Sequence, residues 1–235
     1  ILDNSPIKIE KRLYGTNLLV KSPKILKEYS KPLVILKAGL YNKEIKDDII
    51  NNINSNVKFI WSNMEEIFKE LKKMYTGTKG IEEFIASLEN ALSNNKDIIG
   101  IGAGRMGYSL RSHIMRLSHI GFNAYFIGDT TLPRINSNSV VIINSSSGET
   151  PTNILYARQA SAAGSFIITI TSNKNSTIAK LSNLVVEIPI LKSHQLMKTI
   201  YEQYSYLLFD YVSESVVQNL KLDRKEITHN HSILE

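Results

Sequence analysis

The sequence of 235 residues contains no cysteine, which excludes disulfides, zinc–thiolate sites and thiol catalysis. No apolar run approaches the roughly 20 residues of a membrane span. No signal-peptide pattern follows Ile1, and a first residue other than Met leaves open that the sequence begins inside a longer gene. Carboxylates and histidines form no cluster with metal-ligand spacing. We therefore expect a cytoplasmic protein without a metal site.

Positive charge is unevenly distributed along the chain. Residues 1–63 hold 11 Lys and Arg against 6 Asp and Glu, whereas residues 64–235 hold 17 against 16. The basic residues form no arginine cluster interleaved with aromatics, which a nucleic-acid surface would need. A solvated lysine-rich surface explains the excess. We expect neither nucleic acid nor a membrane as a partner.

The first 63 residues are predicted to be separate from the rest. Strand patterns at 33–36 and 57–60 flank a helical pattern at 42–53, and this β-α-β fragment is too small to bury a core by itself. We interpret 1–63 as an appendage or the end of a preceding domain, and 64–235 as the main domain. Amphipathic helices are expected at 64–75 and 81–92.

The main domain alternates strands with helices. Strands are expected at 97–101, 123–127, 139–143, 165–170 and 184–188, and helices at 107–120, 151–163, 176–181 and 195–219. This order predicts a doubly wound α/β fold, a five-stranded parallel sheet with helices on both faces. Ligands of such sheets bind beyond the carboxyl ends of the strands. The loops 102–107, 144–150 and 171–176 lie at such ends.

One of these loops, Ser145–Thr150, has the sequence S-S-S-G-E-T and is called the serine loop below. A β-branched run precedes it, and Pro151 follows at the expected first helical position. Hydroxyls and free backbone N–H groups at a helix N-terminus form an anion site. The alternative interpretation is an ordinary Ser/Gly turn in which Thr150 caps the helix.

A second loop, Gly102–Gly107, reads G-x-G-x-x-G and is called the glycine loop below. With Asp129 near the end of the next strand it matches the dinucleotide fingerprint. Against this interpretation, Arg105 within the loop suits a small phosphate better than a pyrophosphate, and the serine loop would have no role. A Walker A loop is excluded because no G-K-[ST] occurs. An NAD-dependent oxidoreductase stays open as an alternative.

Several stretches together resemble the sugar isomerase (SIS) domain family: Gly100–Gly107, Gly128–Pro133, Ser145–Thr150 and Thr171–Asn173. Within that family the similarity is greatest to the 6-phospho-3-hexuloisomerases. Residues 195–203, Q-L-M-K-T-I-Y-E-Q, are similar to their Q-P-M-G-S-L-F-E-Q, and residues 230–235, N-H-S-I-L-E, resemble R-H-A-N-L-E. The resemblance covers residues 64–235. It implies an SIS fold that binds a phosphorylated sugar and forms a homo-oligomer, a dimer or tetramer.

Four positions depart from the family pattern. Ser146 stands where a glycine is usual, Met106 where a serine is, Lys198 where a glycine is, and Asn230 where an arginine is. We expect each departure to reshape the sugar pocket, so the chemistry is better determined than the substrate.

The resemblance implies an isomerisation through an enediol that requires no cofactor. A base must remove a proton beside a carbonyl and return it to the neighbouring carbon. Glu202 is the predicted base, because it lies early in the last long helix among Tyr201, Tyr204 and Tyr206, which would bury it partly. The alternative is an ion-paired or solvent-facing helix carboxylate, and the resemblance favours the base. His231 is predicted to open the sugar ring or to move a hydroxyl proton, and the resemblance implies that it does so in a neighbouring subunit's site.

For the phosphate and the sugar we predict hydroxyl and backbone contacts. The hydroxyls come from Ser145, Ser147 and Thr150 of the serine loop and from Ser172 of the next loop. Gly104 and Arg105 would contact the sugar or the phosphate. Glu149 carries the wrong charge for an anion, so we expect it to point away or to bond a sugar hydroxyl. A non-catalytic phosphosugar-binding module is the second alternative function.

Overall fold

The computed structural model describes residues 1–12, 14, 18–36, 41–60, 64–189, 192–193 and 195–231. They form two compact units, Ile1–Glu66 and Ile67–Glu235. Within these ranges no helix is both long enough and apolar enough to cross a bilayer.

The first unit is a parallel β-α-β arrangement. Strand β1 (Leu33–Ile35) pairs in parallel with β2 (Lys58–Ile60). Between them α1 (Asn42–Asp48) continues into the π-helical η3 (Ile49–Ile53), so the expected helix over 42–53 changes its hydrogen bonding midway. The unit does bury a small apolar cluster, contrary to our expectation. The 3-10 helix η1 (Pro23–Glu28) contributes Leu26 to this cluster.

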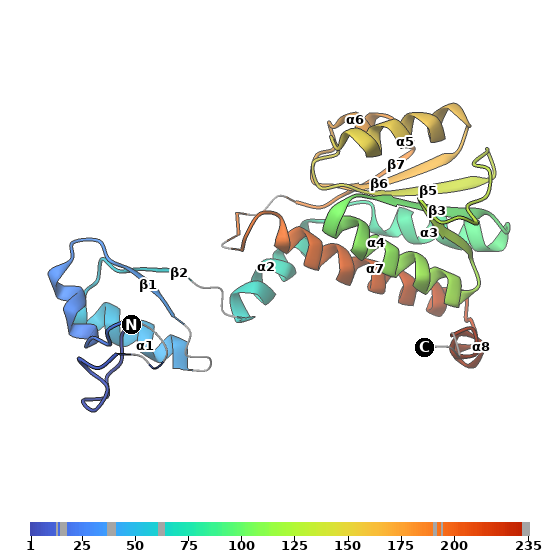
Figure 1. The fold of residues 1–235 in the computed structure, drawn as a ribbon. Coiled ribbons are helices and arrows are strands. Elements are labelled where there is room, and N and C mark those ends of the chain that lie inside the picture. The colour runs from blue at the N-terminus through green and yellow to red at the C-terminus, as the bar shows by residue number, and fades with distance from the viewer. Residues whose placement is uncertain are drawn as a thin grey trace. The chain divides into compact units, whose positions relative to one another are not determined.

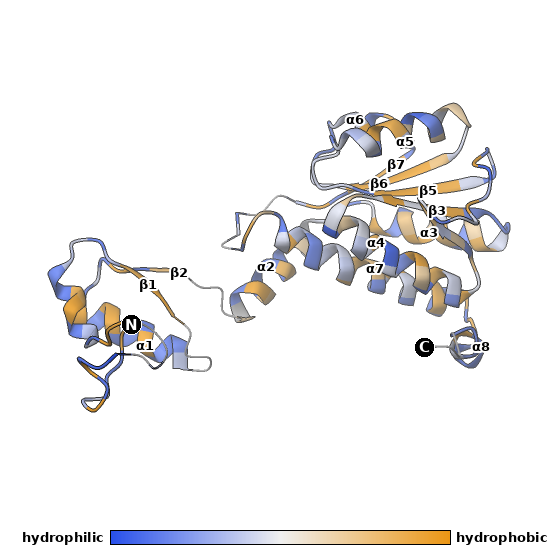
Figure 2. Ribbon diagram, in the orientation of Figure 1, coloured by the Kyte–Doolittle hydropathy of each residue, from blue (hydrophilic) through white to orange (hydrophobic). Residues whose placement is uncertain are grey.

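The second unit contains the predicted five-stranded parallel sheet, in the order β4-β3-β5-β6-β7. The strands are β3 (Asp97–Gly102), β4 (Asn123–Phe126), β5 (Ser139–Asn144), β6 (Phe166–Thr171) and β7 (Leu184–Glu187). They are largely hydrophobic along their length (Figure 2). Strands apolar on both sides need cover on both faces.

Helices cover the two faces of this sheet (Figure 1). Alternate strand residues point to opposite sides, so Ile98 and Ile142 pack with one helical layer while Ile99 and Ile143 pack with the other. The first layer holds α3 (Ile81–Ser93), α4 (Gly104–Ile120) and α7 (Thr199–Asn219), preceded by α2 (Met64–Gly77). The second holds α5 (Pro151–Ala162) and α6 (Thr177–Lys180). The predicted fold class is confirmed.

Strand order places a topological switch point between β3 and β5. The glycine loop leaves β3 for α4 on one face, and the serine loop leaves β5 for α5 on the other. Gly102 and Asn144 are direct partners in the register, so the two loops start side by side. Ligands of open α/β sheets bind in the crevice that forms at such a point.

Two features near the C-terminus differ from the prediction. Helix α7 begins at Thr199 instead of residue 195, because Met197 has φ of 53°, which an α-helix does not allow. A short helix, α8 (Arg224–His229), follows residue 219, where no helix was predicted. Asp223 caps α8 by accepting a hydrogen bond from the Lys225 N–H at 2.8 Å.

Candidate functional site

The backbone of the serine loop is fixed by its neighbours. The Ser145 N–H donates to the Ile170 carbonyl on β6, and the Ser172 N–H donates to the Ser146 carbonyl, both at 3.0 Å. Gly148 closes the turn with φ of 64°, and a Cβ there would lie 2.0 Å from Ser176 Oγ. Only glycine fits this position in the observed conformation of the loop.

The four predicted hydroxyls gather at this loop. Ser145 Oγ lies 3.3 Å from Thr150 Oγ1, and Ser172 Oγ lies 2.8 Å from Ser146 Oγ. Ser147 is exposed. Thr150 precedes α5 but its side chain makes no capping hydrogen bond. The interpretation of the loop as a simple Thr-capped turn therefore lacks its defining contact.

Backbone donors are available beside these hydroxyls. Among the described residues, neither the Ser147 N–H nor the Thr150 N–H has a hydrogen-bond acceptor. Pro151 opens α5 directly behind them, so the positive end of the helix dipole points to the same place. Asn153, in the first turn of α5, is 3% exposed, and its Nδ2 has no partner in the part of the chain that the structure describes. The arrangement suits an anion of the size of a phosphate.

Glu149 does not oppose such an anion. Its Oε1 accepts the Thr177 N–H at 2.7 Å, at the start of α6. That hydrogen bond lowers the pKa of the Glu149 carboxyl below its ordinary value. The carboxylate is thus ionised and directed to α6.

The glycine loop uses its first and last glycines for packing. A Cβ on Gly107 would lie 2.6 Å from the Gly102 carbonyl oxygen, so both residues must be small for α4 to start against β3. Gly104 has φ of 57°, and a Cβ there would meet nothing within 4 Å. Arg105 follows with an exposed side chain.

The structure brings Arg105 and Glu202 together. Arg105 Nε donates to Glu202 Oε2 and forms an ion pair with it. The Glu202 side chain is only 13% exposed, whereas that of Arg105 is 69% exposed. Glu202 lies in the first turn of α7, where the helix dipole favours a carboxylate.

Met106 connects the glycine loop to the serine loop. Its sulfur lies 3.3 Å from the Ser146 backbone nitrogen and accepts that N–H. A thioether is a weak acceptor. The carboxylate of Glu202, the guanidinium of Arg105 and the serine loop therefore belong to one neighbourhood at the switch point of the sheet.

His231 lies elsewhere in the same chain. Its ring centroid is 5.0 Å from that of His119, at the far end of α4. Gly104 and His119 are 15 residues apart on this helix, which corresponds to about 22 Å of helix axis. Within one chain the structure does not bring His231 to Glu202.

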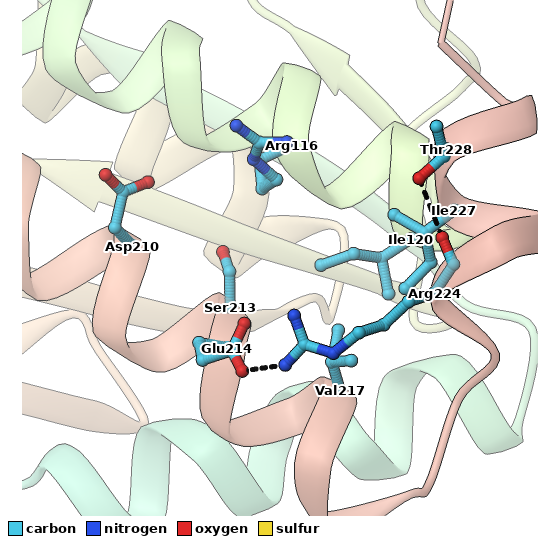
Figure 3. Close-up of a pocket in the computed structure, with 9 residues that line it drawn as sticks. All are labelled: Arg116, Ile120, Asp210, Ser213, Glu214, Val217, Arg224, Ile227 and Thr228. Carbon is cyan, nitrogen blue, oxygen red and sulfur yellow. Dashed lines mark hydrogen bonds and ion pairs between the residues drawn. The ribbon is translucent and has the colours of Figure 1, made fainter.

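A pocket of about 420 Å³ opens near that far end, between α4, α7 and α8 (Figure 3). Arg224 forms an ion pair with Glu214 in its wall. Arg116 of α4 and Asp210 of α7 line the same pocket. The pocket does not include any of the predicted site residues.

The dinucleotide interpretation loses its ribose ligand. Asp129 Oδ1 pairs with Arg111 at 3.1 Å, and its Oδ2 accepts the Phe126 N–H at 2.8 Å. The guanidinium of Arg111 is also stacked over the Phe126 ring, 4.1 Å from its centroid. In the described ranges no group of three or more His, Cys, Asp or Glu side chains could hold a metal ion.

The sequence of this chain is similar to sequences of known proteins. The family model described as "SIS domain" matches residues 91–211. A 3-hexulose-6-phosphate isomerase of Methanocaldococcus jannaschii is 32% identical over 162 residues, which cover 68% of this chain and 89% of that protein. One of Bacillus subtilis is 31% identical over 157 residues, 63% of this chain and 85% of the relative.

Solved structures include a similar protein from Methanococcus jannaschii, for which a molecular function of 3-hexulose-6-phosphate isomerase was inferred. Its crystal structure matches with a TM-score of 0.64 and 30% identity, over 73% of this chain and 96% of that one.

Proposed function

Because the chain belongs to the SIS domain family, we propose that it is a sugar-phosphate isomerase that uses no cofactor and acts through an enediol. The reaction resembles that of 6-phospho-3-hexuloisomerase. The observation that carries the proposal is the position of Glu202, a largely buried carboxylate next to a serine loop with free anion donors.

Each part of the site has a role in this reaction. The serine loop binds the phosphate through the hydroxyls of Ser145, Ser147 and Thr150, with Ser172 beside them, and the α5 dipole adds to the attraction. Arg105 and the backbone at Gly104 contact the sugar or its phosphate. A bound sugar phosphate competes with Glu202 for the exposed Arg105 guanidinium, which frees the carboxylate to act as base.

Glu202 then takes the proton from the carbon beside the carbonyl. The electron pair of that C–H bond forms the enediol double bond, and the carbonyl oxygen gains a proton. The same carboxyl returns its proton to the former carbonyl carbon, while the hydroxyl on the carbon that lost its proton gives up its O–H proton and becomes the new carbonyl. Neither an oxidant nor a metal is needed for the balance.

His231 takes part from another subunit in this proposal. It lies too far from Glu202 of its own chain, so its ring would assist proton transfer on the sugar oxygens in a neighbouring copy of a dimer or tetramer.

Solvent-deuterium incorporation tests the proposal directly. The protein is mixed in D2O with C5 to C7 sugar phosphates, fructose 6-phosphate among them, without added metal or nucleotide, and followed by NMR. We expect exchange at a carbon beside the carbonyl. Glu202→Gln should lower its rate by about a thousandfold, within the range of general-base contributions. Glu214→Gln is the matched control, because Glu214 is on the same helix and also pairs with an arginine.

Other outcomes identify the alternatives. Binding of a sugar phosphate without any exchange would indicate a non-catalytic phosphosugar-binding module. No sugar phosphate binding, together with affinity for NAD(H), would indicate a dinucleotide-dependent oxidoreductase. Equal rates in Glu202→Gln and Glu214→Gln would contradict the role of Glu202.

A further inference from the structure

A buried side-chain amide lies at the centre of the site elements. Asn144 ends β5 directly before the serine loop and is fully buried. Its Nδ2 donates to the Met106 carbonyl at 3.1 Å and to Ser109 Oγ at 3.0 Å, both on α4. Its Oδ1 accepts the hydroxyl of Tyr201, on α7, at 2.9 Å. One amide thus joins three elements that are distant in sequence.

Its contacts are the immediate chain neighbours of the proposed site residues. Met106 follows Arg105, and Tyr201 precedes Glu202. Asn144 itself precedes the serine loop. Any displacement of the Asn144 side chain would therefore act on residues that adjoin Arg105, Glu202 and the serine loop in the sequence.

A second set of hydrogen bonds supports the same connection. The Tyr201 hydroxyl also lies 3.0 Å from the Ile170 carbonyl, the oxygen that accepts the Ser145 N–H at the start of the serine loop. Ser205 Oγ, fully buried, donates to the Glu202 carbonyl at 3.0 Å. Helix α7 is thereby attached to β6 as well as to β5.

The network keeps its hydrogen bonds over a wide pH range. Burial raises the pKa of the Tyr201 hydroxyl well above its ordinary value, so this hydroxyl stays protonated and remains a donor. Buried polar groups are costly unless their partners are in place. Each member therefore fixes the position of the next.

We infer that Asn144 and Tyr201 are positioning residues, which hold the Glu202 carboxylate at a fixed place relative to the serine loop. The inference rests on the proposed function, in which that spacing sets where the proton is removed from a sugar held by its phosphate. Misplacing a reactive group by about 1 Å can cost about a hundredfold in rate.

Tyr201→Phe is the decisive variant, since it removes one hydroxyl and keeps the ring. Tyr204→Phe is its matched control. Tyr204 is 4% exposed on the same helix, and its hydroxyl makes no hydrogen bond to Asn144 or to β6. Ser205→Ala gives a second test, with Ser215→Ala as control, because Ser215 Oγ bonds only the Tyr211 carbonyl of its own helix.

Three quantities are measured for each variant: the exchange rate at saturating fructose 6-phosphate, the dissociation constant for fructose 6-phosphate by calorimetry, and the unfolding temperature. We expect Tyr201→Phe to lower the saturated rate by about tenfold to a hundredfold and to change the dissociation constant by less than about threefold. Ser205→Ala should act in the same direction. Both controls should keep the wild-type rate.

The contrary results are distinct from a failure of the proposed function. Equal rate losses in Tyr201→Phe and Tyr204→Phe, or a weaker affinity at an unchanged saturated rate, would overturn the positioning role. If the wild type binds fructose 6-phosphate but shows no exchange, the proposed function fails. In that case the positioning role is tested by the dissociation constant. The effect of Glu202→Gln on the affinity for fructose 6-phosphate is measured in the wild type and in Tyr201→Phe. Equal effects would overturn the positioning role, whereas effects that differ by about threefold or more would support it. If no sugar phosphate binds at all, the proposed function and the positioning role are both overturned.

Discussion

The glycine loop and the serine loop start side by side on neighbouring strands, yet they use their small residues for different purposes. In the glycine loop, Gly102 and Gly107 touch one another so that α4 can start against the end of β3. In the serine loop, Gly148 turns the chain, and among the described residues two N–H groups beside the hydroxyls have no acceptor. The glycines of the first loop serve packing, whereas we propose that the second loop binds the phosphate.

The helices that follow the two loops also differ. Helix α4 carries His113, 1% exposed, stacked on Phe209 with ring centroids 4.7 Å apart. Helix α5 carries Asn153, which is similarly buried but does not titrate.

Because contact between Gly102 and Gly107 already explains these two glycines, the glycine-rich fingerprint is a weak indication of a cofactor. The contrast between the loops can be tested in four ways.

Gly148→Ala against Gly104→Ala gives the largest expected difference. Both glycines have φ near 60°, so both substitutions cost about 1–2 kcal/mol of backbone strain. Only at Gly148 does the new Cβ meet Ser176, and overpacking adds about 1–3 kcal/mol there. Urea unfolding should show a loss of about 2–5 kcal/mol for Gly148→Ala and about 1–2 kcal/mol for Gly104→Ala. Equal losses would mean that the serine loop can open to accept a side chain.

Acid should destabilise the fold through the helix after the glycine loop. Burial lowers the pKa of His113 to about 3, against an ordinary value of 6.5. Between these values the unfolded chain binds a proton that the folded chain does not, so stability falls as the pH drops below 6.5. The slope is about 1.4 kcal/mol per pH unit. We expect His113→Leu to flatten the dependence of the unfolding free energy on pH between 4 and 6. An unchanged slope would assign the acid sensitivity to other groups.

Removing one hydroxyl of the serine loop should weaken phosphate binding. A hydrogen bond to a charged group contributes about 1.5–3 kcal/mol, so Ser147→Ala should lower the affinity for fructose 6-phosphate by about tenfold or more. Ser161→Ala, at the other end of α5, is the control, since Ser161 is also exposed. Calorimetric titration measures both. An unchanged affinity in Ser147→Ala, with a loss in Gly104→Ala, would assign the anion to the glycine loop.

Arg105→Gln should have the smallest effect on stability. The Arg105 side chain, which pairs with Glu202, is 69% exposed, and ion pairs of exposed side chains contribute less than about 1 kcal/mol to the free energy of unfolding. We expect the unfolding free energy to stay within this limit while the affinity for a sugar phosphate decreases. A loss above about 2 kcal/mol in urea unfolding would show that the pair belongs to the packing of α4 against α7.

Much of this fold is predictable because its pattern is repetitive. Five short apolar runs, most of them separated by helical patterns, predict a covered parallel sheet, and the loops at the carboxyl ends follow from the strand direction. The start of α7 is less predictable. Gln195–Lys198 has no helix breaker, yet Met197 has φ of 53° and Gln195 Nε2 donates to Gln203 Oε1 at 2.9 Å. The local sequence indicates neither feature.

The site was only partly predictable for a similar reason. The serine loop and Glu202 carry recognisable motifs, and the sequence also identifies Arg105. It does not reveal that Arg105 pairs with Glu202, since the two are 97 residues apart. Asn144 and Tyr201 were missed because an asparagine that ends a strand and a tyrosine in a helix are common. Only the fold brings their polar atoms together in the interior. Residues 232–235 of the closing motif lie outside the described residues.

Helix α4 separates His231 from Glu202 within one chain, and this separation has a consequence for the proposed activity at low protein concentration. If His231 serves a neighbouring copy, a working site requires two chains, and its abundance follows an association equilibrium. The activity per molecule then decreases once the protein concentration falls below the dissociation constant of the assembly. By the same reasoning, a chain that has lost Glu202 and a chain that has lost His231 are inactive alone, yet a mixed assembly of the two contains one site with both residues intact.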